Sequence, residues 1–142
     1  MWCLFVLPLI SFPLLQAYKY DVQGYIVNED VGNFTGYPYV KVVLVDHGVF
    51  YDTICGETIA RADGYFHIQC DPTDFRFDDV QLLKIYHRFE ALDCRVNVYR
   101  GRGRGGMVES KNYDALKGDE LEKDESLCPE EIYKRPDEPG RK

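Results

Sequence analysis

Residues 58–70 read TIARADGYFHIQC, and this stretch indicates the fold class more directly than any other. Two short runs of strand-forming residues, 58–62 and 65–70, flank the dipeptide Asp63-Gly64, which tolerates the positive φ of a tight turn. We therefore expect a β-hairpin with a type I′ turn. The second run alternates in polarity, so one face of its strand would hold the apolar side chains of Phe66, Ile68 and Cys70.

The chain from residue 20 to about residue 100 repeats this pattern of short strands separated by turn residues. Residues 40–45 are β-branched and almost entirely apolar, which is typical of a central strand covered on both faces. Gly56 is a candidate β-bulge. No segment has a long helical period. Further strands are expected at 22–27, 53–60, 80–87 and 94–99, and about seven short strands predict an all-β, immunoglobulin-like β-sandwich.

The composition changes after Met107. Residues 109–142 are rich in Glu, Asp, Lys and Pro and hold few large apolar residues, so they have too little to bury to fold alone. We predict one sandwich domain over 18–106, followed by an acidic and largely disordered tail over 107–142. A disulfide from Cys128 would pin this tail to the domain.

The first residues, MWCLFVLPLISFPLLQA, contain no charged side chain and end on the small residue Ala17. An apolar run that ends on a small residue and is followed by a polar stretch is typical of a secretory signal peptide, here 1–17. A membrane anchor is the alternative, but Pro8 and Pro13 interrupt the run and its length is short for a span. We therefore expect the mature chain to be secreted, extracellular and without a transmembrane segment.

Cysteine usage agrees with an oxidising compartment. Removal of the signal peptide removes Cys3 and leaves an even number of cysteines: Cys55, Cys70, Cys94 and Cys128. These four are the candidates for two structural disulfides, and their spacing leaves all three pairings open. No pair has the CxxC spacing that would favour a zinc site.

The sequence Asn33-Phe34-Thr35 has the form of an N-glycosylation acceptor. It lies within an expected loop over 28–38, which is rich in Asn, Asp, Gly and Pro. A glycan needs exposed backbone of this kind, so Asn33 is the candidate glycosylation site.

The net charge of −7, from 17 basic and 24 acidic side chains, argues against nucleic acid as a partner because an acidic protein repels phosphate. Arg100, Arg102 and Arg104, in the sequence YRGRGRGG, depart from this balance. We expect them in a flexible loop by which the chain leaves its last strand, and they are the candidate partner-binding residues. Their partner would be an anionic lipid surface, a sulfated glycan, an acidic extracellular protein or the chain's own tail.

Taken in order, these motifs resemble those of the nematode transthyretin-like proteins, and the similarity spans about residues 20–100. The shared motifs are V-x-G from Val22, V-x-V-x-L from Val40, ADGYF at 62–66 and LKIYH at 83–87. The resemblance implies a small extracellular sandwich with a transthyretin-like core. It implies no single activity, although some members act as secreted adaptors, including bridges to cell-surface phosphatidylserine. Where the family has Asp-Cys after LKIYH, this chain has Arg88-Phe89, which leaves Cys55, Cys70 or Cys128 to pair with Cys94.

His47, His67 and His87 are the only histidines, and they bear on an enzymatic alternative. A transthyretin-related hydrolase acting on 5-hydroxyisourate resembles this chain in its sandwich, but it needs a His on the first strand and a terminal Tyr-Arg-Gly-Ser. Here the first strand has no His, and Tyr99-Arg100-Gly101 is internal. We therefore expect a binding protein and not an enzyme, with no catalytic residue and no cofactor.

Two further alternatives are weaker. A carrier of a small apolar ligand would need an oligomer with a central channel, and the sequence leaves the oligomeric state open. The acidic loop over 71–79 lacks EF-hand spacing, so we interpret it as a solvated loop and not a calcium site. Nothing in the histidine spacing requires zinc, so we expect no metal ion.

Overall fold

The described residues of the chain form eight strands in two sheets. The computed structural model describes residues 20–48, 50–71, 80–90, 93–102, 111–118, 120–122 and 127–135, and no helix occurs among them. The strands are β1 (Tyr20–Val27), β2 (Lys41–Asp46), β3 (Thr53–Ile59), β4 (Tyr65–Cys70), β5 (Val80–His87), β6 (Arg95–Arg102), β7 (Lys111–Asp114) and β8 (Glu120–Glu122). The expected all-β class is therefore confirmed.

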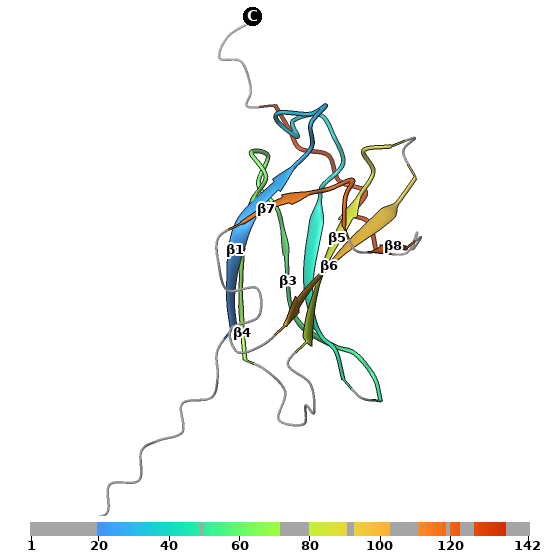
Figure 1. Cartoon of the computed structure of the whole chain (residues 1–142). Helices are drawn as coiled ribbons and strands as arrows, with labels where there is room; N and C mark the ends of the chain where they lie inside the picture. Colours follow the sequence, from blue (N-terminus) through green and yellow to red (C-terminus); the bar gives the residue numbers. More distant parts are fainter. Residues whose placement is uncertain are drawn as a thin grey trace, which may run out of the picture.

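The two sheets lie face to face (Figure 1). One has three strands in the order β4-β1-β7, and the other has five in the order β3-β2-β5-β6-β8. Alternate side chains from both sheets meet between them, so the main core is a single layer of apolar residues. Its members include Val22, Ile26, Val42, Leu44, Phe66, Ile68, Leu83, Ile85 and Tyr113.

The central strands β2 and β5 are buried on both faces, as the apolar run 40–45 predicts. They pair antiparallel with each other, so Leu44 and Leu83 lie side by side on the inner face. Their other faces contribute Val43 and Leu82 to a second buried cluster on the outer side of the five-stranded sheet. Strands of this kind need continuous apolar sequence because neither side meets water.

The bulge expected at Gly56 is present one residue earlier in the chain. The register of β2 against β3 shifts between Leu44 and Val45, which pair with Gly56 and Ile54. Cys55 is therefore the extra residue of the bulge, and the shift places it in reach of Cys70 on β4.

The chain reverses direction between β3 and β4, as the Asp63-Gly64 turn predicts. The prediction that these two strands pair as a hairpin is wrong. β3 pairs with β2 and β4 pairs with β1, so the two strands enter different sheets. The Gly64 amide donates to the Arg61 carbonyl, and Gly64 has a φ of +92°, which makes a longer turn than a two-residue type I′ loop. A Cβ at Gly64 would lie 2.1 Å from the Ile26 carbonyl oxygen, so close packing on β1 also requires glycine here.

The Arg-Gly stretch begins inside a strand and not in a loop. β6 continues through Arg102, three residues beyond the expected end at Tyr99. Leu82 pairs with Arg100 and Val80 with Arg102, so β5 carries the ladder to this point. The glycines do not stop the strand because a neighbour already supplies the backbone hydrogen bonds. Arg104 lies outside the described residues, as does the proposed signal peptide.

The prediction of a disordered tail from residue 107 is wrong for the described part of it. Residues 111–114 form β7, 120–122 form β8, and 127–135 run alongside residues 36–39 at one end of the molecule. Tyr113 and Ala115 are buried in the main core. The segment needs few apolar residues because it adds to strands that already exist and does not have to build a core of its own.

β7 joins the first sheet in parallel with β1, and Gly24 makes this possible. Gly24 pairs with Lys111, and a Cβ at Gly24 would lie 2.2 Å from the Lys111 carbonyl oxygen. Tyr113 then packs on Phe66, with ring centroids 5.8 Å apart. The glycine of the first strand is therefore the docking point for a segment almost ninety residues later in the chain.

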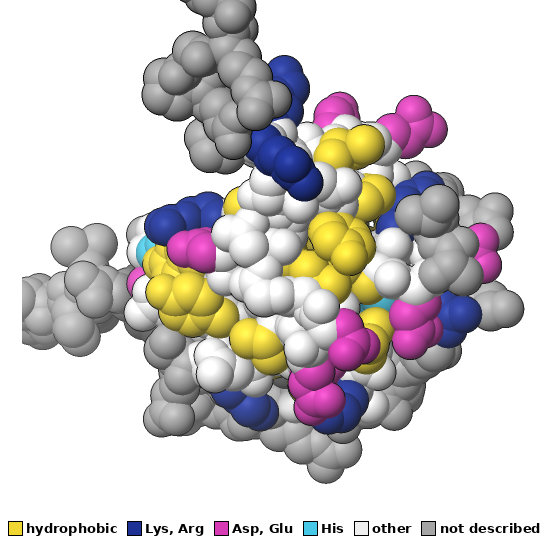
Figure 2. Space-filling view, turned by 90° about the horizontal axis from the view of Figure 1, so that it is seen from above, with side chains coloured by type: hydrophobic (Ala, Val, Ile, Leu, Met, Phe, Trp, Pro, Cys, Tyr) yellow, Lys and Arg dark blue, Asp and Glu magenta, His cyan; other side chains and the backbone are white. Residues whose placement is uncertain are grey.

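Tyr133 closes one end of the core. Its hydroxyl accepts from the Val40 amide at 3.1 Å and donates to the Ala60 carbonyl at 2.5 Å, while the Ala60 amide donates to the Val40 carbonyl. The hydroxyl therefore replaces one of the two hydrogen bonds that a paired Val40 and Ala60 would exchange. Its ring lies beside Phe34 and Tyr39. Hydrophobic side chains gather across this end of the molecule (Figure 2).

Two disulfides are present, as the cysteine count predicts. Cys55–Cys70 joins the edge strands β3 and β4 and so ties one sheet to the other. Cys94–Cys128 ties the start of β6 to the C-terminal segment, and both of its cysteines are buried.

Replacing Tyr133 by Phe should destabilise the protein by about 1–3 kcal/mol, because the Val40 amide and the Ala60 carbonyl would lose their shared partner inside the core. Urea unfolding followed by circular dichroism measures this. Tyr37→Phe is the matched control, since Tyr37 is exposed at the same end, and it should change stability by less than about 0.5 kcal/mol.

The same variant should respond to pH in a defined way. Burial raises the pKa of Tyr133 from 10.0 to about 12, so the folded state keeps the hydroxyl protonated after the unfolded chain has released that proton. Its contribution to stability is complete below pH 10 and is lost as the pH rises toward 12. The stability difference between wild type and Y133F should therefore shrink over this interval. A constant difference would contradict the assigned role of the hydroxyl.

Replacing both cysteines of one disulfide by alanine should lower the free energy of unfolding, and the loss should differ between the two disulfides. Cys94 and Cys128 are 34 residues apart, and Cys55 and Cys70 are 15 apart. The chain-entropy model gives losses of about 4 and about 3 kcal/mol. Guanidinium unfolding of C94A/C128A and C55A/C70A checks the order, and peptide mapping of the oxidised wild type should recover these two pairings alone.

Candidate functional site

The loop between β2 and β3 exposes two aromatic side chains at one end of the five-stranded sheet. Phe50 is 89% exposed and Tyr51 is 77% exposed. Two contacts hold this loop in place. His47 Nδ1 lies 2.7 Å from Asp52 Oδ1, and the His47 amide donates a hydrogen bond to the Val80 carbonyl. Two adjacent, exposed aromatic side chains form an apolar patch, and such patches mark candidate interaction sites.

Arg100, the first arginine of the Arg-Gly stretch, lies at the same end and on the outer face of the five-stranded sheet. Val45 pairs with Ile54 on one side and Leu82 on the other, and Leu82 pairs with Arg100. Directly opposed residues of antiparallel strands share a face, so Ile54 and Arg100 belong to one row across the outer face. Both are exposed. The backbone of Arg102 pairs with Val80, two residues nearer to the loop between β2 and β3.

These residues define a surface that we call the aromatic–arginine end: Phe50, Tyr51, Ile54 and Arg100. It combines exposed apolar side chains with a cationic residue in a protein whose net charge is −7. Figure 1 shows the loop between β2 and β3 projecting at the end where β1 begins, away from the end at which the C-terminal segment packs. Such a surface suits a partner that offers both negative charge and an apolar layer.

Of the residues on this surface, the sequence predicted only Arg100 as a candidate partner-binding residue. Phe50 and Tyr51 lie in the run VFYDTI, which reads as ordinary core sequence when the partner strands are unknown. The available signal was their position directly after the turn residues Asp46-His47-Gly48, because aromatic residues at a hairpin tip have no strand partner to cover them.

The three histidines lie in different parts of the molecule. His47 is in the exposed loop, and His67 is on the outer face of the three-stranded sheet, where it pairs with the Asp21 carboxylate at 2.5 Å. His87 is inside the core. Within the described residues, no three His, Cys, Asp or Glu side chains lie close enough together to hold a metal ion. The acidic loop over 72–79 is outside the described residues.

His87 is fully buried and engaged in hydrogen bonds. Its Nε2 lies 3.0 Å from Asn97 Oδ1, the Phe89 amide points toward its Nδ1 at 3.4 Å, and its ring stacks on Phe89. Burial lowers the pKa of His87 below 6.5, and the bond to Asn97 opposes this only in part. The ring is opposite Arg95, far along β6 from Arg100, so it does not meet the Tyr-Arg-Gly stretch.

The candidate glycosylation site is accessible. Asn33 is exposed in the loop between β1 and β2, and its Oδ1 accepts from the Thr35 amide at 2.9 Å. This loop lies at the end closed by Tyr133, since the Gly36 amide donates to the Tyr133 carbonyl. A glycan on Asn33 would leave the aromatic–arginine end uncovered.

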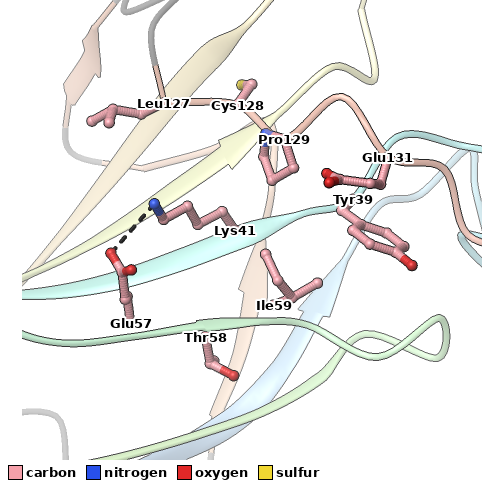
Figure 3. Close-up of a pocket in the computed structure, with 9 residues that line it drawn as sticks. All are labelled: Tyr39, Lys41, Glu57, Thr58, Ile59, Leu127, Cys128, Pro129 and Glu131. Carbon is pink, nitrogen blue, oxygen red and sulfur yellow. Dashed lines mark ion pairs between the residues drawn. The ribbon is translucent and has the colours of Figure 1, made fainter.

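A separate pocket opens on the outer face of the five-stranded sheet, between β2 and β3 on one side and residues 127–131 on the other (Figure 3). Its volume is about 430 Å³, which is within the range of small-ligand sites. The Lys41 ammonium and the Glu57 carboxylate face each other in it at 3.3 Å. The lining residues that the structure describes do not include any residue of the aromatic–arginine end.

Comparison with protein-family models gives no match for this chain, and comparison with curated proteins gives none by sequence. The transthyretin-like resemblance therefore stays an expectation from the motifs. No helix among the described residues is long and apolar enough to cross a membrane.

The protonation of His87 should make the fold less stable in mild acid. The lowered pKa means that the unfolded chain binds this proton first, so the stability it contributes is complete above pH 6.5 and is lost as the pH falls through the folded-state pKa. Urea unfolding from about pH 7 to about pH 5 measures the decline. In His87→Gln, which keeps an NH group for Asn97, the decline should be smaller. An unchanged pH slope would show that another group causes it.

Proposed function

We propose that this chain is a secreted, non-catalytic binding protein of the transthyretin-like family that docks on anionic lipid surfaces through the aromatic–arginine end. The observation on which the proposal depends is that Phe50 and Tyr51 are exposed in the loop at the end of the five-stranded sheet where Ile54 and Arg100 share a row on the outer face. A lipid surface offers anionic head groups above an apolar layer, and this end presents the complementary groups.

Secretion is supported by two independent features. The apolar segment 1–17 has the composition of a signal peptide, and the folded part contains two disulfides. Disulfides form and persist in oxidising compartments, where a signal peptide would deliver the chain.

A binding role is favoured over the hydrolase because of where the histidines lie. The hydrolase mechanism needs an imidazole that substrate can reach, and the His87 ring is 0% exposed. His47 and His67 are reachable, but each is paired with a carboxylate, and they belong to different elements, the loop after β2 and strand β4. None of the three lies beside Arg100 in the strand register.

The geometry favours a lipid surface over a glycan or an acidic protein. A sulfated glycan would engage Arg100 but gives no role to Phe50 and Tyr51, which are among the most exposed large apolar side chains of the described residues. Aromatic rings of this kind gain free energy at the boundary between head groups and acyl chains. Each arginine near an anionic membrane contributes about 1 kcal/mol.

Vesicle sedimentation tests the proposal with the full secreted chain. Binding is expected to phosphatidylcholine vesicles that contain phosphatidylserine, to weaken with salt, and to be nearly absent without the anionic lipid. Changing Arg100, Arg102 and Arg104 together to Ser should weaken it by up to about a hundredfold and leave folding intact. F50S/Y51S should weaken it as well, because the apolar contribution is lost.

Two control variants test whether vesicle binding depends on where the charged and aromatic side chains lie or only on how many the protein has. R61S/K111S/K117S removes the same charge from the three-stranded sheet and its loops, and Tyr25→Ser/Tyr37→Ser removes two exposed tyrosines elsewhere. Both should bind vesicles like the wild type. If the control variants lose as much vesicle binding as the test variants, binding depends on composition alone and the proposal is overturned. Binding to heparin without binding to vesicles would also overturn it.

A further inference from the structure

The pocket between β3 and the C-terminal segment has two walls that are fixed in place. One wall consists of β2 and β3, where the opposed residues Lys41 and Ile59 share the outer face. The other wall is held by the Cys94–Cys128 disulfide and by the Tyr39 amide, which donates to the Glu131 carbonyl at 2.8 Å. A site held by a covalent bond and a sheet needs little ordering to accept a ligand, which favours binding.

Among the described residues that line the pocket, negative charges outnumber positive ones. Lys41 contributes one ammonium, and the carboxylates of Glu57 and Glu131 contribute two negative charges. The Lys41 ammonium is already paired with Glu57 at 3.3 Å. No cationic group within the described part of the chain forms an ion pair with Glu131, whose carboxylate is drawn toward Pro129 in Figure 3.

Apolar surface lies beside these charges. Ile59 is 40% exposed and Leu127 is 38% exposed, and both line the pocket together with Pro129. The Tyr39 ring borders the side near Glu131 (Figure 3). An aromatic ring next to a carboxylate is a favourable setting for an organic cation, since both attract positive charge.

We infer that this pocket binds an organic cation, namely an ammonium group on a short apolar arm. The ammonium pairs with Glu131 beside Tyr39, and the arm lies against Ile59 and Leu127. A free amine and a lysine side chain of a partner protein share this chemistry. The site is independent of the aromatic–arginine end, because Ile59 and Ile54 are about 16 Å apart along β3.

Titration of the oxidised, isotope-labelled full chain tests this by amide chemical shifts. The probes are phenethylammonium, the charge-reversed phenylacetate, the neutral phenethyl alcohol, and N-acetyl-lysinamide as the side-chain source. Phenethylammonium should shift the amides around Lys41, Ile59 and Leu127 and bind about fivefold more tightly than the alcohol. Phenylacetate should bind most weakly. Whichever of phenethylammonium and N-acetyl-lysinamide binds more tightly identifies the source of the ammonium.

Charge variants make the result decisive. Glu131→Gln should remove the preference for phenethylammonium over the alcohol, whereas Glu130→Gln, an exposed neighbour that does not line the pocket, should keep it. Among the described residues that line the pocket, E57Q/E131Q leaves only Lys41 charged, so this variant should reverse the preference toward phenylacetate. An unchanged preference in E57Q/E131Q, shifts outside the pocket, or no binding of any probe at millimolar concentration would overturn the inference.

Discussion

The Tyr133 hydroxyl stands where a backbone hydrogen bond between β2 and β3 would otherwise form, and one end of the molecule is organised around it. It accepts from the Val40 amide and donates to the Ala60 carbonyl, so neither buried group lacks a partner. Its own backbone is bound to Gly36 and Tyr37. One side chain thus joins the C-terminal segment, the loop after β1 and the start of the larger sheet. The pocket wall near Glu131 depends on the same connection.

Strands β1 to β6 were predictable because their signal is local. β2 and β5 are apolar along their length, and their bounds follow from the sequence to within a residue. Pairing was not predictable from local pattern, because strands β3 and β4 alternate equally well whichever sheet they enter. The Asp63-Gly64 turn indicated a reversal of the chain, and Gly64 does adopt a positive φ. The choice of partner depends on Gly24, Cys55 and the core, which no short stretch contains.

The C-terminal segment shows why composition alone was a poor guide. Its charge and low apolar content are those of a disordered tail, yet Tyr113 and Tyr133 are each buried with about 7% exposure or less. An aromatic ring buries more area than an aliphatic side chain, and an added strand obtains its hydrogen bonds from a neighbour. The candidate site was half predictable for a similar reason. The arginines are conspicuous in an acidic chain, whereas the exposure of Phe50 is evident only once the register is known.

The parallel pairing of β7 with β1 has a consequence for biosynthesis. The first strand of the chain cannot complete its sheet until Lys111–Asp114 has been made, and the core stays open at one end until Tyr133 arrives. Most contacts that close the fold therefore join residues far apart in the chain, which slows folding and leaves apolar strand surface uncovered while synthesis continues. A nascent chain of this topology can therefore complete its fold only when synthesis of the described residues is nearly finished.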